Sequence, residues 1–386
     1  MAQAVATDHL FASGHTACAG CGQSLGVRLV MRAAGTNIIA TDSTGCLEVF
    51  SSNYPNSAWR VPWIHSLFEN SAAVASGVEA ALRATGRLDA VRVIGQGGDG
   101  GTADIGFGAL SGMFERGHDV LFVCYDNEAY LNTCVQRSGL TPYDSSTTTS
   151  PSGRVSWGNR TTKKELPQIA VAHGVPYVAT TSVGYPFDLD KKVKKALAIR
   201  GPKYIQVLVP CPLGWRHDTS LSIQIAKLAV ETGLYPLLEY ENGVLTSVRR
   251  IGKKRPVEEY LKPQGRFAHL FQKEGAEEEI AKIQALADAN IERFGLMERP
   301  AEAKKAEEKV MTFTPAELAA FDGQEGRSAY VAYRGKVYDV TGSSLWEGGE
   351  HQMEHRAGRD LTQEIENAPH SEDVLGSFKV AGELRA

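Results

Sequence analysis

The six cysteines of this sequence are the residues whose type and spacing most directly suggest chemistry. They are Cys18, Cys21, Cys46, Cys124, Cys134 and Cys211. The first two form a C-x-x-C pair, which in a reducing compartment indicates a metal, a cluster or a redox dithiol. Zinc usually takes four ligands with a second close pair, and the sequence lacks one. A [4Fe–4S] cluster tolerates distant thiolates. A redox dithiol is expected at the start of a helix, and the apolar pattern that begins at Leu25 allows a helix there.

The segments around the cysteines suggest where three of them lie. Apolar, strand-like runs precede Cys46 at residues 38–40 and Cys211 at residues 204–209. Both cysteines are therefore expected at the carboxyl ends of parallel strands, where such sheets present ligand sites. Cys124 lies inside an apolar run and is predicted to be a small buried hydrophobe.

A glycine-rich turn lies within residues 91–138. It follows an apolar run and reads Gly97, Gly98, Asp99, Gly100 and Gly101. An amphipathic pattern then leads to Gly117, and a second apolar run, residues 120–124, leads to Asp126 and Asn127. This order predicts a βαβ unit with parallel strands and a right-handed crossover. Glycines let backbone N–H groups approach an anion, and the helix start adds a positive dipole end.

Polar residues follow both strands of this unit. Asp99 and Asn127 are therefore expected at the same edge of the sheet. Mg²⁺ is usually held by few protein oxygens together with phosphate oxygens. The sequence thus predicts a magnesium-bound phosphate ligand at this edge.

The motif GGDG, followed by YDNEAYLNT and a glutamine, resembles the thiamine-diphosphate motif of the β subunits of 2-oxoacid:ferredoxin oxidoreductases. The resemblance implies that Mg²⁺ binds the side chains of Asp99 and Asn127 and the backbone oxygen of Ala129. It implies that Asn132 lies near the thiazolium ring. Cys134 stands where comparable members have glycine, close to the reacting carbon. The cofactor-binding turn would consist of Gly98, Asp99, Gly100, Gly101 and Thr102.

Two further sets of site residues follow from this resemblance. The β subunits of the family hold one cubane with a C-x-G-C pair, a third cysteine further on and a fourth in a Pro-Cys-Pro turn. The matching residues here are Cys18, Cys21, Cys46 and Cys211.

The family also places a polar segment near the thiamine ring. His65 and Glu69, expected on one helix face because they are four residues apart, are candidates for contact with cofactor or substrate. A structural hydrogen-bonding role is the alternative.

The whole chain has 386 residues, a length that suggests two or three domains. The predicted boundaries are a catalytic domain at 1–295, a charged linker at 296–312 and a small domain at 313–386.

A net charge of −4 argues against a nucleic-acid partner. No apolar run is long enough to span a bilayer. The N-terminus lacks signal-peptide features, so a cytoplasmic location is expected. Residues 142–162 are Ser/Thr-rich and are expected to form a mobile surface, a lid or a subunit contact.

The C-terminal segment resembles a second family. The words GKVYDVT, AGRD and HS occur in the order of a cytochrome b5-like haem-binding domain. Where that family has its first axial histidine, in HPGG, this chain reads WEGG. The resemblance implies a haem b held by His370 together with a shifted histidine, His351 or His355. The alternative is a b5-like fold that docks subunits without haem.

These patterns predict the fold and the activity. The fold is α/β, a thiamine-diphosphate-binding domain with a largely parallel sheet flanked by helices, followed by a small α+β cytochrome b5-like domain. The resemblance implies oxidative decarboxylation of a 2-oxoacid, pyruvate by default, with coenzyme A. The products are acyl-CoA, CO₂ and two electrons, which pass through the [4Fe–4S] cluster to ferredoxin or another acceptor.

The resemblance also implies partners, and rival functions remain. The expected partners are the α, γ and ferredoxin-like δ subunits, with the glutamate that activates thiamine supplied by α. One rival is the same chemistry on an aryl 2-oxoacid such as phenylglyoxylate. Two others are an electron-transfer subunit without thiamine chemistry and a non-oxidative thiamine decarboxylase.

Overall fold

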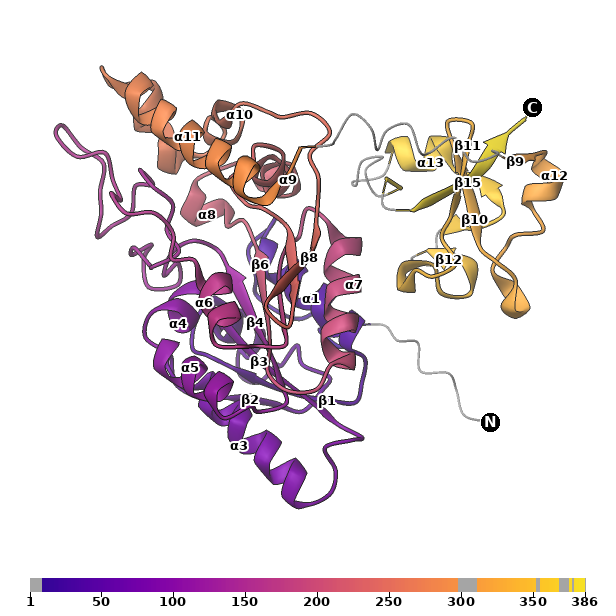
Figure 1. Cartoon of the computed structure of the whole chain (residues 1–386), viewed down its shortest axis with the longest axis horizontal. Helices are drawn as coiled ribbons and strands as arrows, with labels where there is room; N and C mark the ends of the chain where they lie inside the picture. The colour runs from indigo at the N-terminus through magenta and orange to yellow at the C-terminus, as the bar shows by residue number, and fades with distance from the viewer. Residues whose placement is uncertain (1–8, 298–310, 352–354, 368–374, 377, 386) are drawn as a thin grey trace. The chain divides into compact units, whose positions relative to one another are not determined.

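The computed structural model describes residues 9–297, 311–351, 355–367, 375–376 and 378–385 (Figure 1). The chain divides into two compact units, which are described separately. The first comprises Met1–Tyr185 with Lys191–Met297, and the second comprises Pro186–Asp190 with Glu298–Ala386.

The first unit is built on an eight-stranded sheet of described residues in the order β2-β1-β3-β4-β6-β5-β7-β8. The strands are β1 (Ile38–Asp42), β2 (Trp63–His65), β3 (Arg92–Gly98), β4 (Val120–Asp126), β5 (Tyr177–Ser182), β6 (Lys203–Leu208), β7 (Leu238–Glu241) and β8 (Val244–Val248). Strands β1 to β6 pair in parallel, whereas β7 runs antiparallel to β5 and β8 antiparallel to β7. The predicted largely parallel sheet is confirmed.

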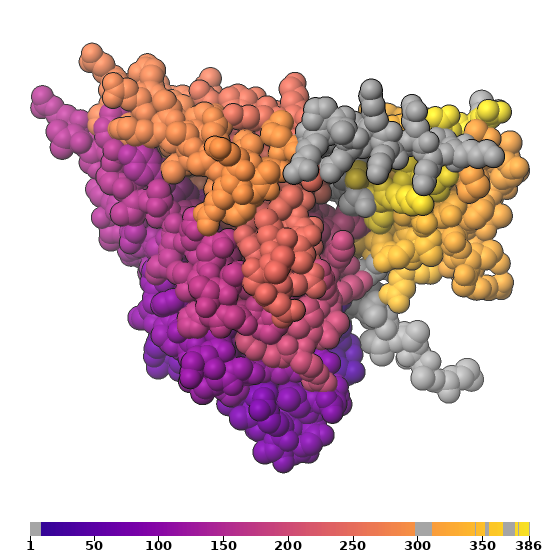
Figure 2. Space-filling model, viewed as in Figure 1, coloured from indigo at the N-terminus to yellow at the C-terminus, as the bar shows by residue number. Residues whose placement is uncertain are grey.

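Helices lie on both sides of this sheet (Figure 1). They are α1 (Gly22–Ala34), α2 (Cys46–Ser51), α3 (Ser71–Ala84), α4 (Asp99–Ala103), α5 (Phe107–Glu115), α6 (Leu166–Ala172), α7 (Pro186–Ala198), α8 (Pro212–Trp215), η1 (Thr219–Leu221), α9 (Ser222–Glu231), α10 (Val257–Leu261), η2 (Gly265–Phe271) and α11 (Ala276–Phe294). Every residue of β4 is buried, as expected for a parallel strand covered on both faces, and the residues before Asp126 are apolar or aromatic. Cys124, in this strand, is fully buried as predicted. The segments of this unit, indigo to orange in Figure 2, pack as one continuous body.

One expectation for local structure is wrong. His65 and Glu69 do not share a helix, because residues Trp63–His65 pair in parallel with β1 and Glu69 lies in the bend that follows. Residues 142–162 form a loop that combines buried and exposed residues. The Asn159 side chain donates to the backbone oxygens of Thr141 (2.8 Å) and Pro142 (3.1 Å), and Ser145 is buried. These polar side chains satisfy buried backbone groups of the loop, whereas Val155 is exposed.

The second unit contains a five-stranded sheet of described residues in the order β14-β10-β11-β15-β9. Its strands are β9 (Met311–Phe313), β10 (Tyr330–Tyr333), β11 (Lys336–Asp339), β14 (Arg359–Asp360) and β15 (Lys379–Leu384), with a separate hairpin of β12 (Glu350–His351) and β13 (His355–Arg356). The helices are α12 (Pro315–Leu318), η3 (Gln324–Gly326), η4 (Ser344–Gly349) and α13 (Thr362–Asn367). The β10–β11 hairpin predicted from the sequence is confirmed. Its core includes Val331, Val340 and Trp346.

Candidate active site

A small hollow lies at the carboxyl ends of the parallel strands. Its walls come from the turn after β3, the segment after β4 and the start of α2, together with Gln23 of α1. Of the sequence-predicted residues, the hollow is lined by Cys46, Gly98, Asp99, Gly100, Gly101, Asn127, Ala129 and Asn132. The fold thus gathers the glycine turn, the expected magnesium ligands and one cysteine around a single volume.

Three oxygens converge on one side of the hollow. One atom of the Asn127 side-chain amide lies 2.7 Å from Oδ1 of Asp99 and 2.9 Å from the backbone oxygen of Ala129. With the amide oxygen in this place, three oxygens face one another without a hydrogen between them, so a cation is needed to hold them together. Without a cation, the amide nitrogen takes the place and donates to both. The donor set suits Mg²⁺, a hard ion that prefers oxygen ligands.

Asp99 is almost completely buried, at 1% exposure. Burial raises the pKa of its carboxyl well above the usual range, and the charge of Asp126 raises it further. Ser138 donates a hydrogen bond to Oδ2 of Asp99 and, with the charge of Lys163, opposes that rise in pKa. A metal ion bound at Oδ1 would replace the proton that burial otherwise favours.

Gly100 is required by a close contact. A Cβ atom at this position would lie 2.2 Å from the ring of Tyr130, whose hydroxyl donates to the backbone oxygen of Gly100 at 3.1 Å. Gly98, by contrast, has open space where a Cβ would point. The side chain of Thr102 does not line the hollow; its hydroxyl donates to the backbone oxygen of Gly98 at 2.7 Å and closes the first turn of α4.

Backbone contact brings the C-x-x-C segment beside the Pro-Cys-Pro turn. The N–H of Gly22 donates to the backbone oxygen of Pro210 at 3.0 Å, and a Cβ at Gly22 would lie 2.7 Å from that oxygen. Cys21 and Cys211 both precede helices. Their sulfurs accept hydrogen bonds from backbone N–H groups one turn on, at 3.5 Å from the nitrogen of Ser24 for Cys21 and at 3.4 Å from that of Gly214 for Cys211.

The four predicted cluster cysteines lie within each other's electrostatic field. The pKa of the Cys46 thiol is raised to about 12, mainly by burial and also by Cys211, Cys21, Asp99 and Cys18. Within the described part of the chain, no three His, Cys, Asp or Glu side chains meet closely enough to hold one metal ion.

The remaining sequence-predicted residues lie outside the lining of the hollow. Nε2 of His65 is 2.8 Å from the hydroxyl of Thr44, which itself lines the hollow. Glu69 is half-buried in the bend before α3. Cys134 is exposed, and its φ of 82° is left-handed, a conformation that favours glycine. Cys134 thus has a backbone conformation that is usual for glycine.

Sequence reasoning missed several residues of this region, among them four polar ones. Gln23 and Thr44 line the hollow, and Ser138 bonds Asp99. Nζ of Lys163 lies 2.7 Å from Oδ2 of Asp126 and 2.7 Å from Oε1 of Glu128. Gln23 directly follows the C-x-x-C-Gly segment, which was a usable signal. Ser138 and Lys163 carry no local signal, because only the fold brings them to the strand ends.

The candidate haem ligands are partly described. His351 is 6% exposed, its ring stacks on Trp346 with centroids 4.9 Å apart, and its Nδ1 lies 3.1 Å from the backbone oxygen of Leu345. Such a carbonyl contact commonly orients histidine ligands. The ring of His355 lies 6.3 Å from that of His351. His370 lies outside the described residues.

Comparison with known proteins gives two family matches. Residues 43–207 match the thiamine pyrophosphate enzyme C-terminal TPP binding domain, and residues 314–384 match the cytochrome b5-like heme/steroid binding domain. Pyruvate synthase subunit PorB of Methanosarcina barkeri is 61% identical over 284 residues, 74% of this chain and 96% of the relative. Ketoisovalerate oxidoreductase subunit VorB of Pyrococcus furiosus is 48% identical over 68% of this chain and 86% of the relative. A Hadesarchaea cytochrome b5 domain protein of solved structure is 54% identical over 20% of this chain and all of that one, with a TM-score of 0.20.

These matches define a class of protein, the thiamine-diphosphate-binding subunits of multisubunit 2-oxoacid:ferredoxin oxidoreductases. The chain belongs to the family of β subunits that includes the PorB subunit of Methanosarcina barkeri. It carries an additional cytochrome b5-like domain at its C-terminal end. None of the described helices is both long enough and apolar enough to cross a membrane.

Proposed function

We propose that this chain binds Mg²⁺-thiamine diphosphate and one [4Fe–4S] cluster and, with partner subunits, oxidises pyruvate and coenzyme A to acyl-CoA and CO₂. The observation that carries the proposal is the shared hollow, in which Asp99, Asn127 and Cys46 line one volume. A cofactor bound by the first two would lie beside a cluster ligand, as transfer of two electrons from cofactor to cluster requires.

The oxygens around Asp99 would hold the cofactor. Asp99, Asn127 and the backbone oxygen of Ala129 would bind Mg²⁺, and the unpaired N–H groups at the start of α4 would meet the diphosphate. Thiamine diphosphate, when bound, supplies the carbanion that adds to the 2-keto carbon and the electron sink for decarboxylation. Ser138 holds the Asp99 carboxylate in position. Asn132 lines the volume where the reacting groups would lie.

The four thiols Cys18, Cys21, Cys46 and Cys211 would hold the cluster. The N–H groups of Ser24 and Gly214 point at two of the sulfurs, and such hydrogen bonds tune the reduction potential of iron–sulfur clusters. Electrons would leave through the cluster to ferredoxin or another acceptor. We infer that α, γ and ferredoxin-like δ subunits complete the enzyme, with the thiamine-activating glutamate on α.

The second unit would hold a haem b. The residues fit in part: His351 has the carbonyl contact of an oriented ligand, and the b5-like family match covers residues 314–384 of the unit. His370 would be one axial ligand and His351 or His355 the other. The haem would be a further station for electrons.

The assembled complex, purified without oxygen, tests the proposal. We expect thiamine diphosphate, at least four non-haem irons and four sulfides for each copy of this chain, a haem absorption band, and ferredoxin reduction that needs both pyruvate and coenzyme A. Absence of iron would contradict the oxidative mechanism and favour a non-oxidative decarboxylase. Reduction without thiamine diphosphate would favour an electron-transfer subunit. Rates with 2-ketoisovalerate and phenylglyoxylate determine whether pyruvate is the preferred substrate.

A further inference from the structure

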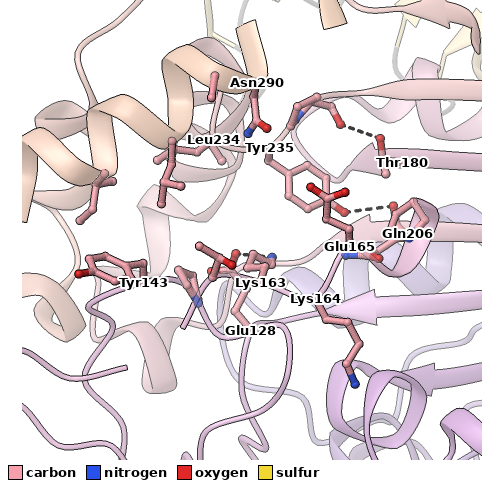
Figure 3. Close-up of a pocket in the computed structure, with 18 of the residues that line it drawn as sticks. Glu128, Tyr143, Lys163, Lys164, Glu165, Thr180, Gln206, Leu234, Tyr235 and Asn290 are labelled. Carbon is pink, nitrogen blue, oxygen red and sulfur yellow. Dashed lines mark hydrogen bonds and ion pairs between the residues drawn. The ribbon is translucent and has the colours of Figure 1, made fainter. Parts of the chain in front are cut away.

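A second cavity lies in the first unit, apart from the hollow described above. It has a volume of about 430 Å³ and lies between α9, α10 and α11, strands β5 and β6, and the loop that leads to α6 (Figure 3). None of the residues that line it lines the hollow around Asp99. Its apolar walls include Ala229, Leu234, Leu238, Leu261, Phe267 and Ile283. A cavity of this size is typical of small-molecule sites.

The charged groups in the walls of the cavity are paired within the protein. Lys163 lies between the carboxylates of Asp126 and Glu128, both at 2.7 Å. Arg293 pairs with Glu165 at 2.6 Å. A charged occupant would therefore find no unpaired opposite charge among these groups, while losing its own hydration.

The neutral polar groups of the cavity are also engaged. The side-chain amide of Asn290 donates to the backbone oxygen of Gly233 at 3.0 Å. The hydroxyl of Tyr235 donates to the backbone oxygen of Gln206 at 3.3 Å (Figure 3). The surface offered to an occupant is thus mainly apolar and aromatic, and hydrogen bonding adds little to its affinity.

We propose that this cavity is a binding site for an uncharged, largely apolar small molecule whose occupancy is coupled to the thiamine diphosphate site. The coupling rests on the proposed function. Lys163 lines the cavity and bonds Asp126, the residue before Asn127, and the side-chain amide of Gln206, also in the wall, donates to the same carboxylate at 2.8 Å. An occupant that shifts Lys163 or Gln206 shifts the carboxylate that precedes a magnesium ligand.

Titration of the assembled complex with 1-aminoanthracene, an uncharged fluorescent aromatic amine, tests the site. We expect saturable binding with enhanced emission. Anthracene-1-carboxylate, which has the same rings and a negative charge, should bind at least ~10-fold more weakly because its charge stays unpaired. Equal affinity for the two probes, or no saturable binding, would overturn the proposed site.

Two tryptophan variants on one helix locate the bound probe. Ala289 and Ala281 are both exposed residues of α11, but only Ala289 lines the cavity. Ala289→Trp should raise the dissociation constant of 1-aminoanthracene at least ~10-fold, and Ala281→Trp should change it less than ~2-fold. Equal effects of the two variants would show that the probe binds elsewhere and would overturn the assignment.

The coupling has its own readout. Saturating 1-aminoanthracene should change the dissociation constant of thiamine diphosphate by at least ~5-fold, and the cofactor should change that of the probe by the same factor. An unchanged constant would refute the coupling while leaving the site. A complex that binds the probe but never thiamine diphosphate would instead contradict the proposed function.

Discussion

Asp99 illustrates how single residues carry the proposed chemistry. Its carboxyl group is buried, burial raises its pKa, and the side-chain amide of Asn127 lies against both this carboxyl and the backbone oxygen of Ala129. This arrangement is costly for a folded protein unless a proton or a cation is present. The sequence placed Asp99 and Asn127 correctly at neighbouring strand ends, because polar residues after apolar parallel strands lie at one edge of the sheet.

Replacing Asp99 should weaken cofactor binding. Asp99→Asn removes the negative charge, so the affinity of the assembled enzyme for thiamine diphosphate should fall ~10- to 100-fold, as is typical when a metal site is disturbed. Cofactor titration followed by the rate of acceptor reduction measures this. Asp89→Asn is the matched control, because the Asp89 side chain is 94% exposed at the surface. Equal affinity in both variants would refute the role assigned to Asp99.

Asp144 should make stability depend on pH. The pKa of its carboxyl is raised from the usual 3.8 to about 7, and burial is the largest cause. Arg160 opposes this rise, and Glu279 contributes to it. Since the folded pKa is the higher one, the folded state holds an extra proton between these values. Stability should therefore fall as pH rises through that window.

The variant Asp144→Asn isolates this effect. The amide cannot ionise, so the unfolding midpoint of the variant should rise relative to that of the parent between about pH 5 and about pH 7. Thermal unfolding of the chain at several pH values measures the difference. The pKa of Glu279 is lowered to about 2, so its titration lies outside the window. A difference that stays constant or narrows with pH would contradict the assignment.

At the scale of elements, the approach of the segment before α1 to the Pro-Cys-Pro turn decides whether the cysteines meet. In Gly22→Ala, the added Cβ would lie 2.7 Å from the oxygen of Pro210, so one of the two segments must move. We expect the non-haem iron of this chain, separated from the δ subunit, to fall by more than half, while the sheet stays folded. Far-ultraviolet circular dichroism and iron analysis measure the two effects.

Gly77→Ala is the control for this prediction. Gly77 lies inside α3 with no atom within 4 Å of its added Cβ, so the change should keep the iron and stabilise the helix by about 0.5–1 kcal/mol. Loss of iron in Gly77→Ala, or full iron in Gly22→Ala, would show that the contact with Pro210 does not position the cluster ligands.

Elements were predictable where periodicity and local turns determine them. The parallel strands, the hairpin of β10 and β11 and the burial of Cys124 all followed from the sequence. His65 was misplaced because tertiary pairing with β1 overrides a helical spacing. The hydrogen bonds of Asn159 within the loop at 142–162 were not predictable, because Ser and Thr serve mobile surfaces and hydrogen-bonded loops equally, and the role of this loop as a lid or a subunit contact stays a prediction. The roles given to the cluster cysteines stay predictions.

At the scale of the whole molecule, the chain has two compact units, of which the first resembles PorB proteins and the second is the b5-like domain. The PorB relative from Methanosarcina barkeri matches the chain over 96% of its own length without the second unit being needed. A chain that ends at Met297 should therefore still support pyruvate oxidation within ~2-fold when an artificial dye accepts the electrons, because the first unit has its own core. Any haem band should vanish from that complex. Loss of dye reduction in a folded, iron-loaded complex would show that the second unit takes part in the chemistry.

Because the backbone at Cys134 is left-handed, exchanging its side chain for none leaves the neighbouring main chain where it is. Position 134 can therefore lose its thiol without a change in main-chain conformation. Because Cys134 directly follows Thr133, which lines the hollow, this exchange would alter the chemistry beside the proposed cofactor site at little cost in folding.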